Sequence, residues 1–208
     1  MSRRSRKLKN YFLLDINPVV RFLILSDTVL KGAAGLLAPI FALFIEDFII
    51  TDNTAVVAGI AMGAFLLTKS IMQIPIAELI DRIRGEKDDF WIMFVSSMVI
   101  ALIPLTYLFA HTPLQLYIIQ LILGICTAFT FPTYMAIFTR HIDKSKEGTE
   151  WGVYFTTTDL SSALLAIIGG YVASSQGFPA LIIVITLASI VGTLLLLPIR
   201  PYIRMPKK

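Results

Sequence analysis

The chain has 208 residues, of which 56% are hydrophobic and only 15% are charged. Soluble domains usually carry about 25% charged residues, so this composition argues against a soluble enzyme and against a disordered chain. The single cysteine, Cys126, excludes an internal disulfide framework and any multi-cysteine metal site, and two histidines cannot supply a His-rich ligand set. We therefore expect an integral membrane protein with no metal and no other cofactor.

Six apolar segments have the length of about 20 residues that is needed to cross a bilayer. Short polar joints such as Asp52-Asn53 separate these segments, and no joint is long enough to fold separately. Pro39, Pro75, Pro104 and Pro132 lie inside these segments, where a proline can bend a helix. The sequence therefore predicts one all-α membrane domain over residues 1–208. Its expected transmembrane helices span residues 19–45, 55–80, 90–110, 113–138, 151–173 and 178–197.

The positive charges predict the orientation of these helices. All 18 Lys and Arg residues except Lys31 and Lys69 lie in the tails, at the start of the first segment, or in the second-to-third and fourth-to-fifth loops. Because Lys and Arg in short loops stay on the cytoplasmic side, we expect a multi-pass protein of the cell membrane with both termini in the cytoplasm. The basic tails can also contact anionic membrane lipids, and we expect no nucleic-acid partner.

The second-to-third loop carries a recognisable pattern. Ala77 is followed, after three spacers, by Asp81-Arg82 and then by the short run Arg84-Gly85-Glu86-Lys87. This pattern resembles the loop signature of the major facilitator superfamily, which carries it after its second helix. Ala77 replaces the usual glycine, and Gly85 lies one position later than in the common form. The alternative interpretation is an ordinary charged turn.

The fourth segment strengthens the resemblance. Gln120-x-x-x-Gly124 followed by Pro132 is similar to the family's fourth helix, with Gln120 in place of the arginine of many members. In the first segment, Asp27 and Pro39 have the same spacing as Gln120 and Pro132, which agrees with two inverted three-helix repeats. The fifth segment lacks the Gly-x-x-x-Gly-Pro pattern of drug–proton antiporters. The resemblance implies one half of a major-facilitator fold, since the usual unit has twelve helices in two halves.

A second copy of the chain in the same orientation can supply the missing half. The resemblance therefore implies a parallel homodimer that carries a small solute along its two-fold axis by alternating access. In the family, the loop aspartate lies at the start of a helix in the opposite half. Here Asp81, with Arg82 and Arg84, is expected to meet Thr149 of the partner's fifth segment, because a helix N-terminus attracts a carboxylate. The alternative is a capping contact within one subunit.

Four ionisable residues lie well inside the apolar segments, where each costs about 2.5–3.5 kcal/mol unless it faces protein or water: Asp27, Lys31, Lys69 and Asp159. We expect Asp27 and Asp159 to gain or lose protons during transport, because burial raises the proton affinity of a carboxylate while a nearby lysine lowers it. The alternative is a permanently paired network that holds the helices together. The candidate residues for substrate binding or proton coupling are Asp27, Lys31, Lys69, Gln73, Gln120 and Asp159.

No phosphate-binding loop, nucleophile–base arrangement or metal-ligand cluster occurs in the sequence, so we expect no enzymatic activity. Besides a homodimeric transporter, two functions remain open: a non-transporting assembly or regulatory subunit, and one half of a heterodimeric transporter. The sequence selects neither the substrate nor the direction of transport. His111 and His141 lie in turns, where we expect them to be solvated.

Overall fold

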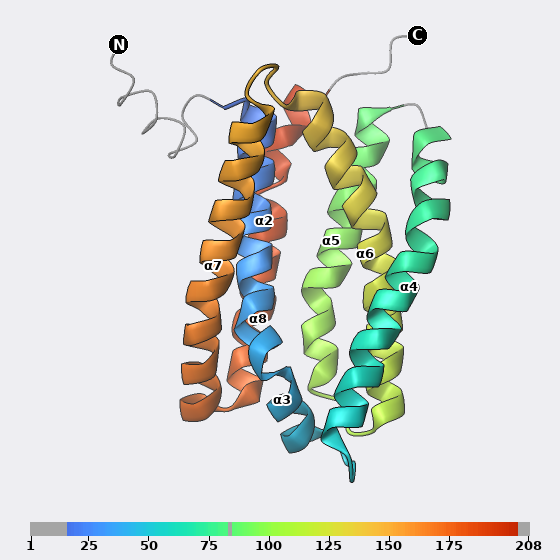
Figure 1. The fold of residues 1–208 in the computed structure, drawn as a ribbon, viewed down its shortest axis with the longest axis vertical. Helices are drawn as coiled ribbons and strands as arrows, with labels where there is room; N and C mark the ends of the chain where they lie inside the picture. The colour runs from blue at the N-terminus through green and yellow to red at the C-terminus, as the bar shows by residue number, and fades with distance from the viewer. Residues whose placement is uncertain (1–15, 83–84, 204–208) are drawn as a thin grey trace.

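The computed structural model describes residues 16–82 and 85–203. Within these ranges it has six helical spans that are long and apolar enough to cross a membrane, and it has no β-strand (Figure 1). The first span combines α2 (Pro18–Leu37), η1 (Ala38–Ile40) and α3 (Phe41–Phe48), and the others are α4 (Thr54–Arg82), α5 (Glu86–Tyr107), α6 (Pro113–His141), α7 (Glu147–Gln176) and α8 (Phe178–Leu194), which continues into η2 (Leu197–Tyr202).

Each segment expected from the sequence corresponds to one of these spans, with differences at the ends. The third helix ends at Tyr107, three residues before the expected boundary at 110. The first span is interrupted at Pro39, where one 3₁₀ turn separates α2 from α3 because proline has no N–H for the α-helical ladder. By contrast, Pro75, Pro104 and Pro132 lie within continuous α-helices.

Local sequence explains where several helices begin. The side chain of Asn17 accepts a hydrogen bond from the backbone N–H of Val19, at 2.9 Å, and so caps α2. Thr112 and Gln115 form a reciprocal capping box at the start of α6. Gly177 joins α7 to α8 with a φ of 81°, a conformation that glycine adopts without strain.

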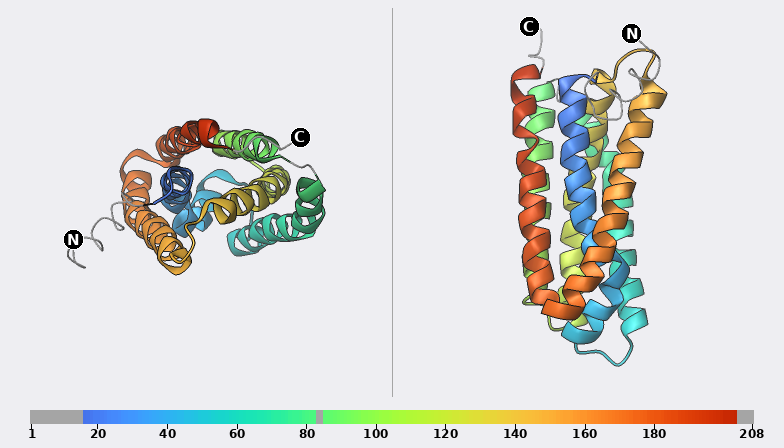
Figure 2. Two further views of the ribbon diagram at one scale, coloured as in Figure 1. Left: turned by 90° about the horizontal axis from the view of Figure 1, so that it is seen from above. Right: turned by 90° about the vertical axis from the view of Figure 1, so that its left-hand side faces the viewer.

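The helices pack in a pattern with internal symmetry. Helix α2 packs on α7 and α8, α6 packs on α4 and α5, and α5 packs on α8. Exchanging the first three spans with the last three converts the contacts of α2 into those of α6 and leaves the contact between α5 and α8 unchanged. This is the arrangement expected of two inverted three-helix repeats. Seen from above, α5 and α8 lie together on one side, α4 and α7 lie at opposite flanks, and α2 and α6 lie between them (Figure 2).

The core has one large cluster at each end of the bundle, and a third, smaller cluster of Ile76, Ile80 and Ala128 joins α4 to α6. At the end where the first span finishes, here called the Phe48 end, Phe44 packs against Tyr107 and Phe178. At the other end, here called the Pro18 end, buried residues such as Phe90 and Phe138 form the second cluster. Dispersion contacts of this kind hold membrane helices together, because lipid offers no hydrophobic driving force between them.

Candidate functional site

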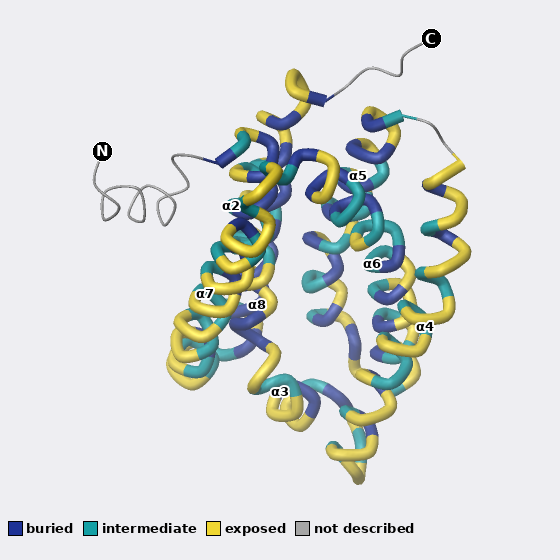
Figure 3. The backbone as a smooth tube through the Cα atoms, turned by 45° about the horizontal axis from the view of Figure 1, so that its top comes forward, coloured by how far each residue is buried: buried dark blue, intermediate teal, exposed yellow. Residues whose placement is uncertain are grey.

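One face of the bundle is open. It is formed by α4, α6, α2 and α7 in that order, opposite the pair α5 and α8, and we call it the wall (Figure 2). The two flanking helices are the least covered: 11% of the most apolar stretch of α4 and 17% of that of α7 is buried, against 39% for α5 and 44% for α8. Figure 3 shows the same contrast along the backbone.

The wall carries charged side chains within the membrane spans. Lys31 on α2 and Asp159 on α7 are exposed, while Asp27 and Lys69 are partly exposed. Within residues 16–82 and 85–203, none of these four side chains forms an ion pair. Charged side chains at this depth usually face protein or water, so contact of the wall with lipid alone would be unfavourable.

A polar seam joins α2 to α7. The hydroxyl of Tyr154 donates a hydrogen bond of 2.7 Å to Oδ2 of Asp27. The next residue of α2, Thr28, donates a hydrogen bond from its hydroxyl to that of Thr157, at 3.2 Å. The hydroxyl of Ser162 donates to the backbone carbonyl of Lys31, at 3.1 Å. These contacts place Asp27 and Lys31 beside α7, the helix that carries Asp159.

Close helix approach at this seam depends on glycine. A Cβ atom at Gly169 would lie 2.0 Å from the carbonyl oxygen of Leu36, so no larger residue fits without movement. The symmetry-related contact between α6 and α4 uses Gly124, where a Cβ would lie 2.8 Å from the carbonyl oxygen of Phe65. Small residues therefore set the position of both flanking helices, as is usual in membrane bundles.

At the other flank, Lys69 and Gln73 lie one turn apart on α4 and are both partly exposed. The ammonium nitrogen of Lys69 lies 5.1 Å from the ring centroid of Phe131 on α6, a cation–π contact. The structure therefore gathers Asp27, Lys31 and Asp159 near the α2–α7 seam and keeps Lys69 and Gln73 at the opposite edge.

Gln120 lies elsewhere. It is buried and donates a hydrogen bond of 3.2 Å from Nε2 to the hydroxyl of Tyr107, which belongs to α5 behind the wall. We expected Gln120 to take part in substrate binding or proton coupling. The helical period shows which residues share a face but not which neighbouring helix that face contacts, and here the neighbour is α5.

Two tyrosines belong to the site although sequence reasoning did not single them out. Tyr154 holds Asp27, and its ring centroid lies 6.0 Å from that of Tyr134 on α6. The hydroxyl of Tyr134 is buried and has no hydrogen-bond partner among the described residues. Tyrosine is an ordinary residue in an apolar helix, so only the three-dimensional approach of α6, α2 and α7 reveals this group.

The candidate gating residues lie at the Pro18 end. Asp81 and Arg82 are exposed at the end of α4, and Thr149 is exposed in the first turn of α7. Arg84 lies outside the described residues. The N-cap position of α7 contributes no side-chain hydrogen bond to its first turn within the described part of the chain. In that turn the N–H of Thr149 donates to the carbonyl oxygen of Lys146, at 2.9 Å, and the acidic residues are Glu147 and Glu150.

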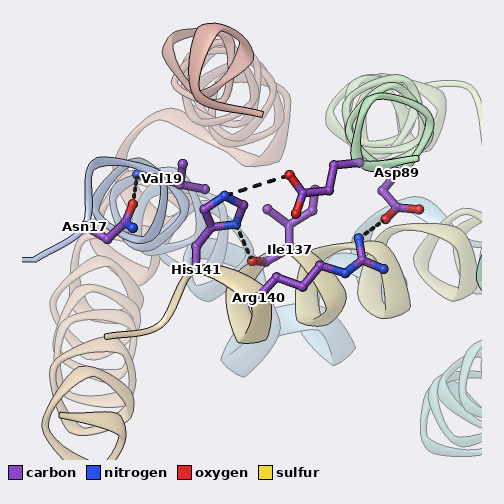
Figure 4. Close-up of polar contacts among 7 residues, drawn as sticks. Asn17, Val19, Asp89, Ile137, Arg140 and His141 are labelled. Atoms are coloured by element: carbon purple, nitrogen blue, oxygen red, sulfur yellow. Dashed lines mark hydrogen bonds and ion pairs between the residues drawn. The ribbon is translucent and has the colours of Figure 1, made fainter. Parts of the chain in front are cut away.

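A charged layer closes the same end between α5 and α6 (Figure 4). Arg140 forms an ion pair with the buried carboxylate of Asp89. His141 is buried rather than solvated: its Nδ1 lies 3.1 Å from the carbonyl oxygen of Ile137, and its Nε2 lies 3.9 Å from the carboxylate of Glu86. The expectation of a solvated histidine was wrong because α6 extends to this residue. No group of three or more potential metal ligands occurs in the described ranges.

Comparison with known proteins assigns the fold to a family. The sequence model of the Major Facilitator Superfamily matches residues 25–208. The chain belongs to this superfamily. It is 27% identical over 169 residues to the uncharacterized MFS-type transporter MJ1560 of Methanocaldococcus jannaschii, and 25% identical over 170 residues to the multidrug resistance protein MdtG of Klebsiella pneumoniae. Each alignment covers 81% of this chain and 40% of the relative.

A solved structure agrees with this assignment. The POT family transporter PepTSo superposes with a TM-score of 0.74 at 13% identity, over 91% of this chain and 39% of that transporter. The chain thus has the all-helical fold of this superfamily over about 40% of the length of the relatives it matches. It is a multi-pass membrane protein, and the loop signature around Asp81 lies at the end of α4, where the resemblance places it.

Proposed function

We propose that this superfamily chain is half of a secondary transporter and that two parallel copies form the complete carrier for a small solute. One observation carries the proposal: the wall exposes Lys31 and Asp159 within membrane spans, and the described residues leave them without an ion-pair partner. A second wall facing the first would enclose these groups in protein and water, as intramembrane charges require.

The cycle would follow alternating access, in which the two copies rock against each other about the enclosed site. At the Pro18 end, which we assign to the cytoplasm of the cell together with both termini, Asp81 of one copy would contact the first turn of α7 near Thr149 of the second copy. Arg82 and Arg84 flank this contact. Its formation would close the cytoplasmic side, and its loss would open it.

Proton coupling is assigned to Asp27 and Asp159. An ionised Asp27 can only accept hydrogen bonds, as it does from Tyr154, whereas a protonated one can also donate. Proton binding would therefore rearrange the hydrogen bond that joins α2 to α7. Asp159 lies on the exposed side of α7, where solvent or solute can reach it.

Because relatives of this chain bear the name multidrug resistance protein, a fluorescent drug such as ethidium is the first solute to test. The purified chain is reconstituted into liposomes, and dye flux is followed at several pH values with and without an imposed proton gradient. We expect flux that depends on the gradient. Replacement of Asp27 or Asp159 by Asn should abolish this dependence, whereas Glu46→Gln, at an exposed residue near the end of the first span, should not.

Two results would contradict the proposal. A chain that binds a panel of solutes but moves none would be a non-transporting membrane subunit. Flux that requires a second, different polypeptide would make the chain half of a heterodimer. The detergent-corrected mass of the active species separates the homodimer from that case.

A further inference from the structure

The two edges of the wall face different helices when two copies meet. Viewed along the helices, α7 lies at one flank of the wall and α4 at the other (Figure 2). A two-fold rotation about an axis parallel to the helices brings the α4 edge of one copy to the α7 edge of the second copy, and the reverse on the other side. The facing pair at each edge is therefore α4 with α7 of the second copy, never α4 with α4.

The charges on these edges match in depth. Helix α4 ends, and helix α7 begins, at the Pro18 end of the bundle (Figure 1). At 1.5 Å per residue, Lys69 lies about 20 Å from Arg82 at the end of α4, and Asp159 lies about 18 Å from Glu147 at the start of α7. The two side chains thus reach nearly the same level of the membrane.

The charges also match in sign. Lys69 is the only charged residue of α4 between Thr54 and Glu78, and Asp159 is the only one of α7 beyond Glu150. The described part of the chain offers neither of them an ion pair, and the ammonium group of Lys69 lies over the ring of Phe131 instead.

Small residues on the same two helices permit close approach. Gly59 and Gly63 on α4 have no atom within 4 Å of an added Cβ, and the same holds for Gly170 on α7. Gly59 lies about 8 Å from the start of α4 at Thr54, and Gly170 about 9 Å from the end of α7, so they lie at matching depth towards the Phe48 end. Small residues let the backbones of two membrane helices approach closely.

We propose that Lys69 of each copy pairs with Asp159 of the second copy, so that two identical ion pairs fasten the two edges of a homodimer. This inference rests on the homodimer of the proposed function and names the contact that selects the partner. The competing contact is an ion pair between Asp159 and Lys31 of the same chain, whose backbone already touches α7 through Ser162.

Charge reversal in separate chains distinguishes the two contacts. In a Lys69→Asp homodimer both edges bring two carboxylates together, and in an Asp159→Lys homodimer both edges bring two ammonium groups together. A mixed dimer of the two variants has one wild-type pair and one reversed pair, so both of its edges are complementary. Like charges in an interface cost enough to weaken each variant's self-association by at least about 100-fold.

The test co-expresses the two variants with different affinity tags and measures dimer mass and dye flux after tandem purification. Each variant alone should be monomeric and carry at least about tenfold less flux than wild type, and the mixture should yield a dimer with flux restored. The control mixes Lys31→Asp with Asp159→Lys, which should give no mixed dimer. Bifunctional maleimides should also join Lys69→Cys and Asp159→Cys on separate chains in a Cys126→Ser background.

Three other results would refute the ion pair between Lys69 and Asp159 of the second copy. Single variants that remain dimeric, a mixture that pairs no better than either variant alone, or rescue only when Lys31→Asp and Asp159→Lys are in one chain would each do so. A wild-type dimer with flux but no complementation would refute the ion pair and leave the transport proposal standing. A wild-type chain that is monomeric and carries no flux would refute the proposed function itself.

Discussion

The packing of α2 against α7 predicts that alanine substitutions at two adjacent glycines, Gly169 and Gly170, differ in their effect on stability. A Cβ atom at Gly169 would lie 2.0 Å from the carbonyl oxygen of Leu36, and 2.7 and 2.8 Å from its carbonyl carbon and Cα. The Leu36 oxygen would have to recede by roughly 1.4 Å to reach ordinary van der Waals contact. At Gly170 the same atom would meet nothing within 4 Å.

Replacing either glycine by alanine stabilises the helix by the same amount, about 0.5–1 kcal/mol, through helix propensity. The difference in stability between the two variants therefore reports only the packing of α7 against α2. Overpacking of this kind costs about 1–3 kcal/mol. We therefore expect Gly169→Ala to have a free energy of unfolding lower than that of Gly170→Ala by this amount. Unfolding in mixed detergent micelles measures both. Equal stabilities would refute the close approach of α2 and α7 and, with it, the position of the α7 edge of the wall.

Two further predictions concern polar contacts. Tyr154→Phe removes the hydrogen bond to Asp27 and should lower the free energy of unfolding by about 1.5–3 kcal/mol. The control Tyr171→Phe, at an exposed residue, should leave the free energy of unfolding unchanged. Equal effects of the two substitutions would argue against the hydrogen bond between α2 and α7. Arg140→Gln leaves the buried carboxylate of Asp89 without its ion-pair partner and should lower the free energy of unfolding by about 2 kcal/mol. Asp89→Asn should lower it less, because the guanidinium that loses its partner is half-exposed. Thermal unfolding in detergent checks this order, and the reverse order would contradict the burial of Asp89.

The sequence was enough to predict the six membrane spans, because apolar segments of membrane length that are separated by polar joints have few alternative structures. It also sufficed for the family, since the loop around Asp81 and the pattern in the fourth segment lie where the resemblance requires them. The sequence did not distinguish the four prolines inside the segments: Pro39 interrupts the first span, whereas Pro75, Pro104 and Pro132 lie in continuous α-helices.

The side-chain contacts could not be predicted in the same way. Tyr154 and Asp27 are 127 positions apart in the sequence, and nothing local indicates that they meet. Gln120 shares a helical face with Gly124, which packs against α4, yet its own side chain contacts Tyr107 of α5. His141 is buried because α6 continues beyond the apolar segment, and helix ends are the least certain part of a sequence-based assignment.

The central claim is that the wall lines a water-filled path between two copies and is not covered by lipid. Ala34 on α2 is exposed on the wall, close to Lys31. Ile71 on α4 is 68% exposed and, being two residues from Lys69, lies on the opposite side of that helix. In a Cys126→Ser background reconstituted in liposomes, Ala34→Cys should react with a membrane-impermeant maleimide, and Ile71→Cys should not. If Ala34→Cys were as unreactive as Ile71→Cys, the wall would face lipid and the proposed carrier would be wrong.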